Sequence, residues 1–264
     1  MIQIRRSLAQ QLRKVLGRAL AISARHATFP VQLETGNRGL VIRARKDDVA
    51  VSYWEPGELP SEHIVVPFAL LCDAEGKDDG LVTIQVDAKR KQVSAKFRDG
   101  AVPQLVKYCG AIPPKDDEAF TEPGGFSEYP AELLAALVAA RETAADERTR
   151  YALNCIQLRG KSGEIAATDG RQILIQSGFE FPWDDNVLVP TTKAFSCREF
   201  GDGGTVQVGR TDAWVTVACG PWSAHLEIKA GLRFPDVDSV IPPAEVEATR
   251  VEFSNDDAEF LAKS

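Results

Sequence analysis

The chain has few of the residue types from which active sites and membrane segments are built. Its 264 residues include three histidines and five cysteines, and no two cysteines form a CxxC pair. An odd number of scattered thiols argues against structural zinc and favours a reducing compartment. No apolar run approaches the roughly 20 residues of a membrane span, and the basic N-terminus lacks the apolar core of a signal peptide. We therefore expect a cytoplasmic protein with no metal ion, no cofactor and no membrane partner.

Residues that could support catalysis are also scarce. The best candidate pair is Cys219 with His225, six residues apart, with no nucleophile elbow, phosphate loop or metal-spacing motif beside them. Asp-Asp pairs at 78–79, 116–117 and 184–185 lie in loops and fit turns better than catalytic dyads. An enzyme is therefore disfavoured, because no group of residues meets the criteria of a catalytic site.

Charge is distributed unevenly along the chain. The net charge is −7, yet residues 1–26 hold six Arg and Lys and no Asp or Glu, so the remainder carries −13. A basic strip on an acidic body allows a protein to hold a polyanion on one surface and repel it from the others. A solvated helix face is the alternative interpretation of the same strip.

The sequence repeats itself with an offset of 122 to 125 residues. Val65–Pro67 aligns with Leu188–Pro190 at an offset of 123, and Val31–Leu33 aligns with Ile156–Leu158 at an offset of 125. Small loop insertions produce such a drift. The pattern predicts two copies of one domain, at residues 1–122 and 123–247.

The pattern that opens each copy occurs a third time near the end of the chain. Residues 250–254 and 256–261 repeat the strand, polar cap and first helical turns that open the other two copies. We expect residues 248–264 to be the start of a third unit, with an ordinary capped C-terminal helix as the alternative.

Each copy shows the same predicted order of a helix, three strands, one strand, a short helix and three strands. In the first copy the helix is expected at 7–24, and in the second at 130–145, with a short helix from 190 to about 200. A proline- and acid-rich stretch from Pro113 to Gly125 is expected to join them. The predicted fold class is α+β, with mostly antiparallel sheets and two helices of each copy packed on one face.

An ordered set of short motifs resembles the bacterial DNA sliding clamp, the beta subunit of DNA polymerase III. The set runs from Arg150–Asn154 through Ala167–Arg171 and Val189-Pro190 to Arg233–Asp236 and Val240–Pro242. The first copy matches more loosely, through Met1–Ile4, Arg25 and Val66-Pro67. Each motif alone is weak, but their order and spacing cover nearly the whole chain.

The resemblance implies DNA clamp domains and a ring of six such domains around duplex DNA. In the family, basic inner helices touch phosphates without reading sequence, which permits sliding. The residues carried over by the family pattern are Arg25, Arg150, Tyr151 and Lys193. Charge and helical placement alone add Arg13, Lys14, Arg141, Arg148 and Arg198, for which a solvated face is an equal alternative.

The resemblance also implies a pocket for short linear peptides of DNA polymerase and clamp loader, between the second and third domains. Apolar walls with a few polar groups suit an extended peptide. The matching residues are Leu153, Thr168, Gly170, Arg171, Ile173, Val240 and Pro242. Plain strand core is the alternative for the aliphatic members.

The implied function is a non-catalytic processivity factor that encircles duplex DNA, tethers DNA polymerase III and forms a homo-oligomeric ring. Family rings contain three-domain chains, and three copies of a two-domain chain would also supply six domains. A clamp-fold adaptor that binds protein partners without loading on DNA is the alternative, since a fold does not fix a function.

Overall fold

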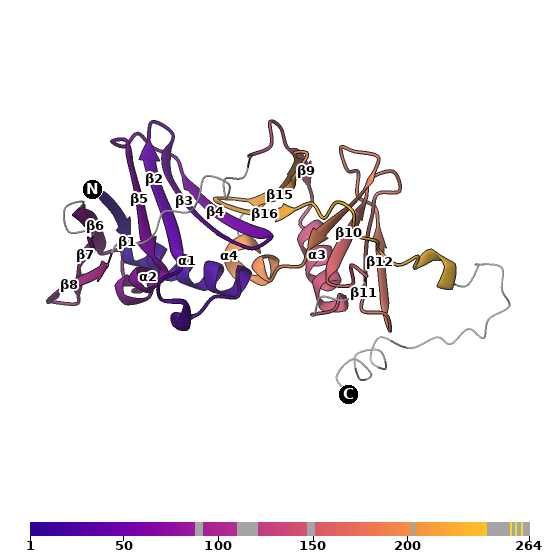
Figure 1. Ribbon diagram of the computed structural model, residues 1–264, viewed down its shortest axis with the longest axis horizontal. Helices are drawn as coiled ribbons and strands as arrows, with labels where there is room; N and C mark the ends of the chain where they lie inside the picture. The colour runs from indigo at the N-terminus through magenta and orange to yellow at the C-terminus, as the bar shows by residue number, and fades with distance from the viewer. Residues whose placement is uncertain are drawn as a thin grey trace.

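The computed structural model describes residues 1–87, 92–109, 121–146, 151–201 and 204–241, with positions 254, 257 and 260. Most of the predicted linker, and nearly all of the predicted third start, lie outside the described residues. We call residues 1–109 the first unit and residues 121–241 the second unit. Figure 1 shows the two units side by side along the long axis of the molecule.

The first unit begins with a strand and a helix and continues through seven strands and a second helix. Its elements are β1 (Ile2–Arg5), α1 (Arg6–Ala19), the 3₁₀ turn η1 (Ala24–His26), β2 (Pro30–Gly36), β3 (Gly39–Lys46), β4 (Val49–Glu55), β5 (Glu62–Pro67), α2 (Phe68–Ala74), β6 (Leu81–Asp87), β7 (Gln92–Asp99) and β8 (Val102–Cys109).

The second unit repeats this order. Its elements are β9 (Ser127–Tyr129), α3 (Glu132–Thr143), β10 (Cys155–Arg159), β11 (Glu164–Thr168), β12 (Ile173–Ser177), β13 (Asn186–Pro190), the 3₁₀ turn η3 (Ala194–Ser196), α4 (Arg198–Gly201), β14 (Val206–Arg210), β15 (Trp214–Cys219), β16 (Trp222–Glu227) and the 3₁₀ turn η4 (Asp238–Val240). The predicted α+β class, with antiparallel sheets and few helices, is confirmed. No helix in the described ranges is long and apolar enough to cross a membrane.

One eight-stranded sheet runs through both units, which the sequence did not predict. Its order is β5-β2-β3-β4-β16-β15-β14-β9, so the units join where β4 pairs with β16. Val51 lies opposite Ala224, and the Tyr53 and Trp222 rings meet edge to face at 4.9 Å. Two four-stranded sheets, β1-β6-β7-β8 and β12-β11-β10-β13, complete the units.

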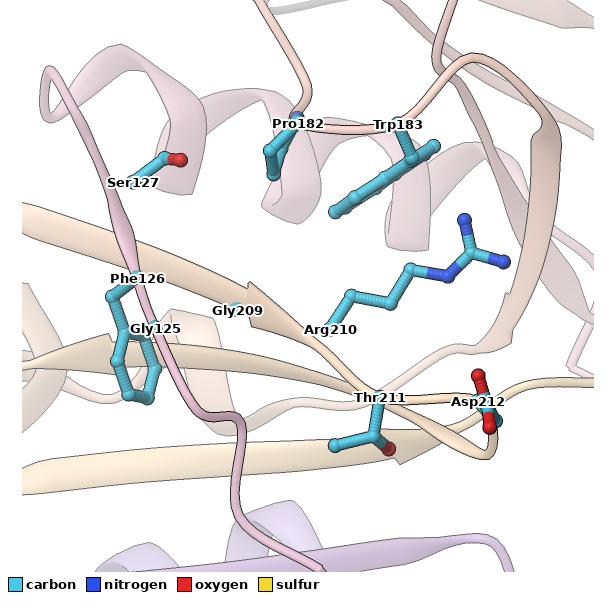
Figure 2. A pocket seen from close by; sticks show the side chains of 9 residues that line it. All are labelled: Gly125, Phe126, Ser127, Pro182, Trp183, Gly209, Arg210, Thr211 and Asp212. Atoms are coloured by element: carbon cyan, nitrogen blue, oxygen red, sulfur yellow. The ribbon is translucent and has the colours of Figure 1, made fainter.

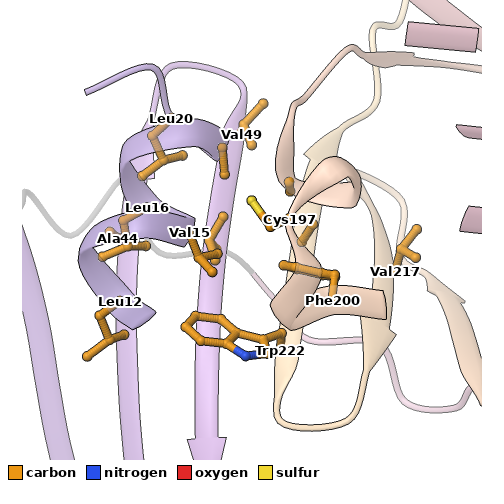
Figure 3. Close-up of a cluster of buried hydrophobic side chains, with 14 of the residues drawn as sticks. Leu12, Val15, Leu16, Leu20, Ala44, Val49, Cys197, Phe200, Val217 and Trp222 are labelled. Carbon is orange, nitrogen blue, oxygen red and sulfur yellow. The ribbon is translucent and has the colours of Figure 1, made fainter. Parts of the chain in front are cut away.

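The helices of both units pack on one side of this sheet. α1 contacts α2 and η3, and α3 contacts η3 and β11. Leu12 and Leu16 of α1 are fully buried, and Figure 3 shows them on the same side as Phe200 of α4, with Val49 and Trp222 between the units. A single core therefore extends across the joint, which ties the two units together through apolar contact.

α1 ends earlier than the predicted residue 24. Ala21 adopts a left-handed φ of 48°, and the Ile22 amide donates to the Gly17 carbonyl at 3.0 Å. This is the Schellman arrangement that closes a helix. Ile22 is buried, so its apolar side chain continues the predicted helical pattern although it lies beyond the helix.

The prediction of one continuous short helix from Pro190 to about Phe200 is wrong. Pro190 ends β13, and the Thr192 hydroxyl then caps the Ala194 amide at 3.1 Å. Cys197 is extended, with ψ at 132°, so η3 and α4 are separate short turns. A local cap and one extended residue therefore replace the first and middle turns of the predicted helix.

The joint between the units contains a buried histidine. His225 of β16 is 1% exposed, with Nε2 2.9 Å from Ser52 Oγ of β4 and Nδ1 2.9 Å from Thr216 Oγ1 of β15. Burial, aided by the charge of Arg43, lowers the pKa of His225 to about 3. The imidazole is therefore neutral at physiological pH and links one unit to the other by hydrogen bonds.

We expect this histidine to make stability fall at mildly acidic pH. The folded pKa of about 3 lies below the ordinary value of 6.5, so the unfolded chain binds the proton first. The contribution of the buried, neutral His225 to the free energy of unfolding is complete above pH 6.5. It declines by about 1.4 kcal/mol for each pH unit below that value, which is a loss of about 2 kcal/mol at pH 5. Urea unfolding at pH 7.5 and pH 5 measures this loss of stability. The loss should be absent in His225→Gln and should persist in His63→Gln, a control at an exposed histidine. An equal pH dependence in His225→Gln would contradict this assignment.

Candidate functional site

The exposed face of α1 carries two cations, Lys14 and Arg18. Lys14 and Arg18 lie four residues apart, one helical turn, and both are exposed, while Val15 and Leu16 turn into the core. Lys14 Nζ lies 3.5 Å from the Gln10 amide oxygen. Since residues 6–19 contain no acid, this face of α1 has a positive potential.

Arg18 lies where the two units meet, and the predicted site residues did not include it. The Thr192 hydroxyl donates to the Ala19 carbonyl at 3.1 Å, which brings the turn before η3 against the end of α1. Burial raises the pKa of the Cys197 thiol, and the nearby Arg18 guanidinium opposes that rise. In the sequence, the four-residue spacing between Lys14 and Arg18 was the signal that could have placed Arg18 beside Lys14 on one helix face.

Lys193 extends the same basic seam into the second unit. It is exposed at the start of η3, and its carbonyl accepts from the Cys197 thiol at 3.6 Å. The part of the chain that the structure describes places no carboxylate within ion-pair distance of Lys14, Arg18 or Lys193. We call these three residues the basic seam.

The other predicted cations divide into three groups. Arg13 pairs with Glu75, and Arg141 pairs with Asp146 at 2.7 Å, so both charges are offset. Arg25 is exposed in η1, and Arg198 is exposed in α4. Arg148 and Arg150 lie outside the described residues, while Tyr151, next to them, is 46% exposed.

Five of the predicted peptide-pocket residues gather at the β11–β12 hairpin. The Thr168 hydroxyl donates to the Gln172 carbonyl at 2.7 Å and accepts from the Gly170 amide at 3.0 Å. A Cβ on Gly170, whose φ is +91°, would lie 3.8 Å from Leu153. Arg171 and Ile173 are exposed in or beside the same turn. The hairpin thus presents a fixed rim with aliphatic side chains on it.

The remaining predicted pocket residues lie elsewhere. Val240 is 65% exposed in η4, and Asp238 of that turn pairs with Arg159 at the opposite end of β10 from Cys155. Those two ends are about 13 Å apart at the usual strand rise. Pro242 lies outside the described residues. Val240 therefore does not share the hairpin rim, because η4 is tied to the far end of β10.

An exposed leucine missed by the sequence pattern lies close to the hairpin rim. The Ala152 amide donates to the Arg233 carbonyl at 3.1 Å, which brings the segment around Leu232 beside Leu153. Leu232 is exposed, whereas the nearby Phe234 is buried in a small cluster on the outer side of β10 and β11. One exposed leucine between two recognised motifs gives no distinctive sequence pattern.

A separate surface pocket of about 520 Å³ lies beside β14. Figure 2 shows Arg210 reaching beneath Trp183, with Phe126 on the other side of the strand. The Arg210 guanidinium lies 5.4 Å from the Trp183 ring centre and also pairs with Asp185. These contacts hold the loop of residues 178–185 against β14. Packing and a cation–π contact therefore account for the wall of the pocket.

The one candidate catalytic pair is not assembled. Cys219 pairs with Trp222 across the β15–β16 turn, whereas His225 lies opposite Thr216 farther along the hairpin. The two residues are about 10 Å apart by strand rise. Both His225 ring nitrogens lie within hydrogen-bond distance of hydroxyls. The geometry therefore gives no thiol–imidazole dyad.

The architecture is that of a DNA clamp. No protein-family model and no curated protein matches the sequence. Among solved structures, the DNA polymerase III beta subunit of Pseudomonas aeruginosa matches with a TM-score of 0.69 at 20% identity, over 92% of this chain and 68% of that one. The corresponding protein of Borrelia burgdorferi, solved with a natural product, gives 0.70 at 13% identity, over 91% and 67%.

The match to these clamps covers about two thirds of their length, which corresponds to two of their three domains. The beta chain of Streptococcus pneumoniae gives a similar result, with a TM-score of 0.68 at 15% identity. The resemblance stated from the sequence motifs is therefore confirmed at the level of the fold.

Proposed function

We propose that this chain is a sliding-clamp-like processivity factor that encircles duplex DNA and carries no catalytic activity. The observation that carries the proposal is the basic seam, Lys14, Arg18 and Lys193, which lies on the helix side of a sheet shared by two repeated units. A ring holds DNA by topology, so a few phosphate contacts suffice and base readout is not needed. Domain boundaries at 122 and 247, with a third unit starting at 248, belong to this proposal.

The DNA-facing set is proposed to combine the basic seam with Arg25, Arg198 and Tyr151, and with Arg148 and Arg150 beside Tyr151. Arg13 and Arg141 contribute less, because Glu75 and Asp146 already offset their charges. Sequence-independent contacts of this kind allow the duplex to move through the ring.

The β11–β12 hairpin rim is proposed to bind short linear peptides of a DNA polymerase or clamp loader. The aliphatic surface of this rim comes from Leu153 and Ile173, and the exposed Leu232 extends that surface. Gly170, which has no side chain, leaves the approach to it open. The backbone at Thr168 and Asp169 is fixed by side-chain hydrogen bonds, so little ordering is needed on binding.

A second candidate function is a clamp-fold adaptor that binds proteins without encircling DNA. Two of the predicted DNA-contacting cations are already neutralised by carboxylates, and Asp73 of α2 is held by the Tyr108 hydroxyl on the helix side. These features lower the positive potential along α2 and α3. Such an adaptor would keep the hairpin rim as a peptide-binding surface but would not encircle DNA.

Encirclement is tested with linear duplex DNA anchored on beads. The chain is added while the free DNA end is open, the end is then blocked with a bulky protein, and the beads are washed in high salt. A ring threaded on the duplex should stay on end-blocked DNA and slide off an open end, because salt removes phosphate contacts but not a topological link.

Retention that depends on the end block supports the clamp and excludes the adaptor. Equal release from blocked and open DNA would contradict encirclement and leave the adaptor as the better account. The matched control adds the chain after the end is blocked, which prevents threading without changing any surface.

A further inference from the structure

Glu75 brings a negative charge to the edge of the helix face that carries the basic seam. It follows directly after α2, and its carboxylate pairs with the Arg13 guanidinium of α1. Arg13 precedes Lys14 by one residue, which turns it about 100° around the helix axis. Because α2 packs against α1 on that side, Arg13 lies between the exposed seam and the acid of the neighbouring helix.

The backbone of Glu75 is held in place by a buried side chain. The Arg6 guanidinium donates to the Glu75 carbonyl at 2.8 Å, and the Gly76 amide donates to the Arg6 carbonyl at 3.2 Å. Arg6 is itself buried, so the chain after α2 cannot move away from α1 without breaking these hydrogen bonds. The Glu75 carboxylate is therefore kept beside Arg13.

Arg141, the other predicted DNA contact that a carboxylate offsets, has a more exposed partner. The Asp146 side chain is 82% exposed, whereas the Glu75 side chain is 29% exposed. Solvent and salt weaken an exposed ion pair more than a partly buried one. A phosphate should therefore displace Asp146 from Arg141 more easily than Glu75 from Arg13.

A second acid adds to the negative charge at this end of α2. The Tyr108 hydroxyl donates to the Asp73 carboxylate and holds it there. Burial raises the pKa of the Cys72 thiol, Arg13 opposes that rise, and Glu75 and Asp73 both add to it. Two acids and one cation therefore lie around the same point, and the cation is outnumbered.

We infer that Glu75 competes with DNA phosphate for Arg13 and so limits how tightly the duplex is held. The inference rests on the proposed clamp function and names a residue that regulates its DNA contact. While Glu75 holds Arg13, the duplex meets the basic seam without a contact from Arg13. Removing the Glu75 charge lets Arg13 donate a charge-assisted hydrogen bond to a phosphate and removes a carboxylate that repels DNA.

A limit of this kind suits a protein that slides. Each phosphate contact releases counterions and strengthens binding, and every such contact must break when the duplex moves. An acid that withholds one cation keeps the contacts few and the duplex mobile. Glu75 therefore trades affinity for movement at the edge of the basic seam.

The test measures duplex binding after the Glu75 charge is removed. Glu75→Gln should bind a labelled duplex about fivefold more tightly than the native chain at low salt, with a salt slope steeper by about one. Arg13→Gln should change the affinity of the native chain less than about twofold. In the Glu75→Gln background, the same Arg13→Gln change should remove the whole gain. Fluorescence anisotropy at several salt concentrations measures these quantities for all four chains.

Glu58→Gln is the matched control, because Glu58 is exposed in the connection between β4 and β5. It removes the same charge and should change the affinity less than about twofold, since distant charges are screened. Weaker binding by Glu75→Gln would mean that Glu75 orients Arg13 for DNA, and equal binding would mean that Arg13 does not reach phosphate. Either result overturns the inference while the native chain still binds DNA. Loss of binding in the native chain and every variant would overturn the proposed function as well.

Discussion

Reversing the basic seam to Lys14→Glu, Arg18→Glu and Lys193→Glu should weaken duplex binding about 100-fold at low salt and reduce the salt slope by about three. Each side chain is exposed, and none has a carboxylate partner in the described part of the chain. The loss comes from three phosphate contacts and from repulsion by the new carboxylates. Anisotropy of a labelled duplex, titrated at several salt concentrations, measures both quantities.

A charge reversal elsewhere on the surface tests whether this result is specific to the seam. Arg38 is exposed in the β2–β3 turn, at the opposite end of the sheet from the helices. Arg38→Glu changes the net charge in the same direction and should alter the affinity less than about threefold, since long-range charges are screened. Equal losses at Arg38 and at a single seam residue would show that net charge, and not the seam, determines binding.

Arg6→Met should lower the free energy of unfolding of the first unit by about 3 kcal/mol. The Arg6 guanidinium is buried and donates to the carbonyls of Ala74, Glu75 and Arg98. It also pairs with Asp78 at 2.9 Å and Asp99 at 3.1 Å. These bonds hold the start of α1, the end of α2 and the β7–β8 turn in one place, and methionine replaces only the stem.

Urea unfolding followed by far-UV circular dichroism measures this loss. Arg5→Met is the matched control, because Arg5 is the adjacent but exposed cation, and it should change stability by less than about 0.5 kcal/mol. Arg6→Lys tests the planar fork, since an ammonium keeps the charge but cannot reach several carbonyls at once. A stable Arg6→Met variant would mean that the network contributes little.

The repeat offset predicted most of the fold. The alignment of Val65–Pro67 with Leu188–Pro190 corresponds to β5 and β13, each an edge strand beside β2 or β10. Periodicity also located α1 and α3 to within a few residues at one or both ends. Patterns of this kind depend on local burial, and local burial is repeated when a domain is repeated.

Contacts between distant segments were not predictable in the same way. Arg6 belongs to the basic strip in the sequence, yet it is buried, because its partners come from positions about 70 and 90 residues away. The pairing of Arg13 with Glu75 and the β4–β16 joint are likewise tertiary. One sequence records the charges of such residues but not which of them meet.

Solution mass tests the central claim, that copies of this chain form a ring, most directly. Light scattering of the 264-residue chain at several concentrations should give about 86 kDa, three times its 28.8 kDa, independent of concentration. Three chains with two units each would supply the six domains of a clamp ring. A mass of one chain at every concentration would contradict the ring.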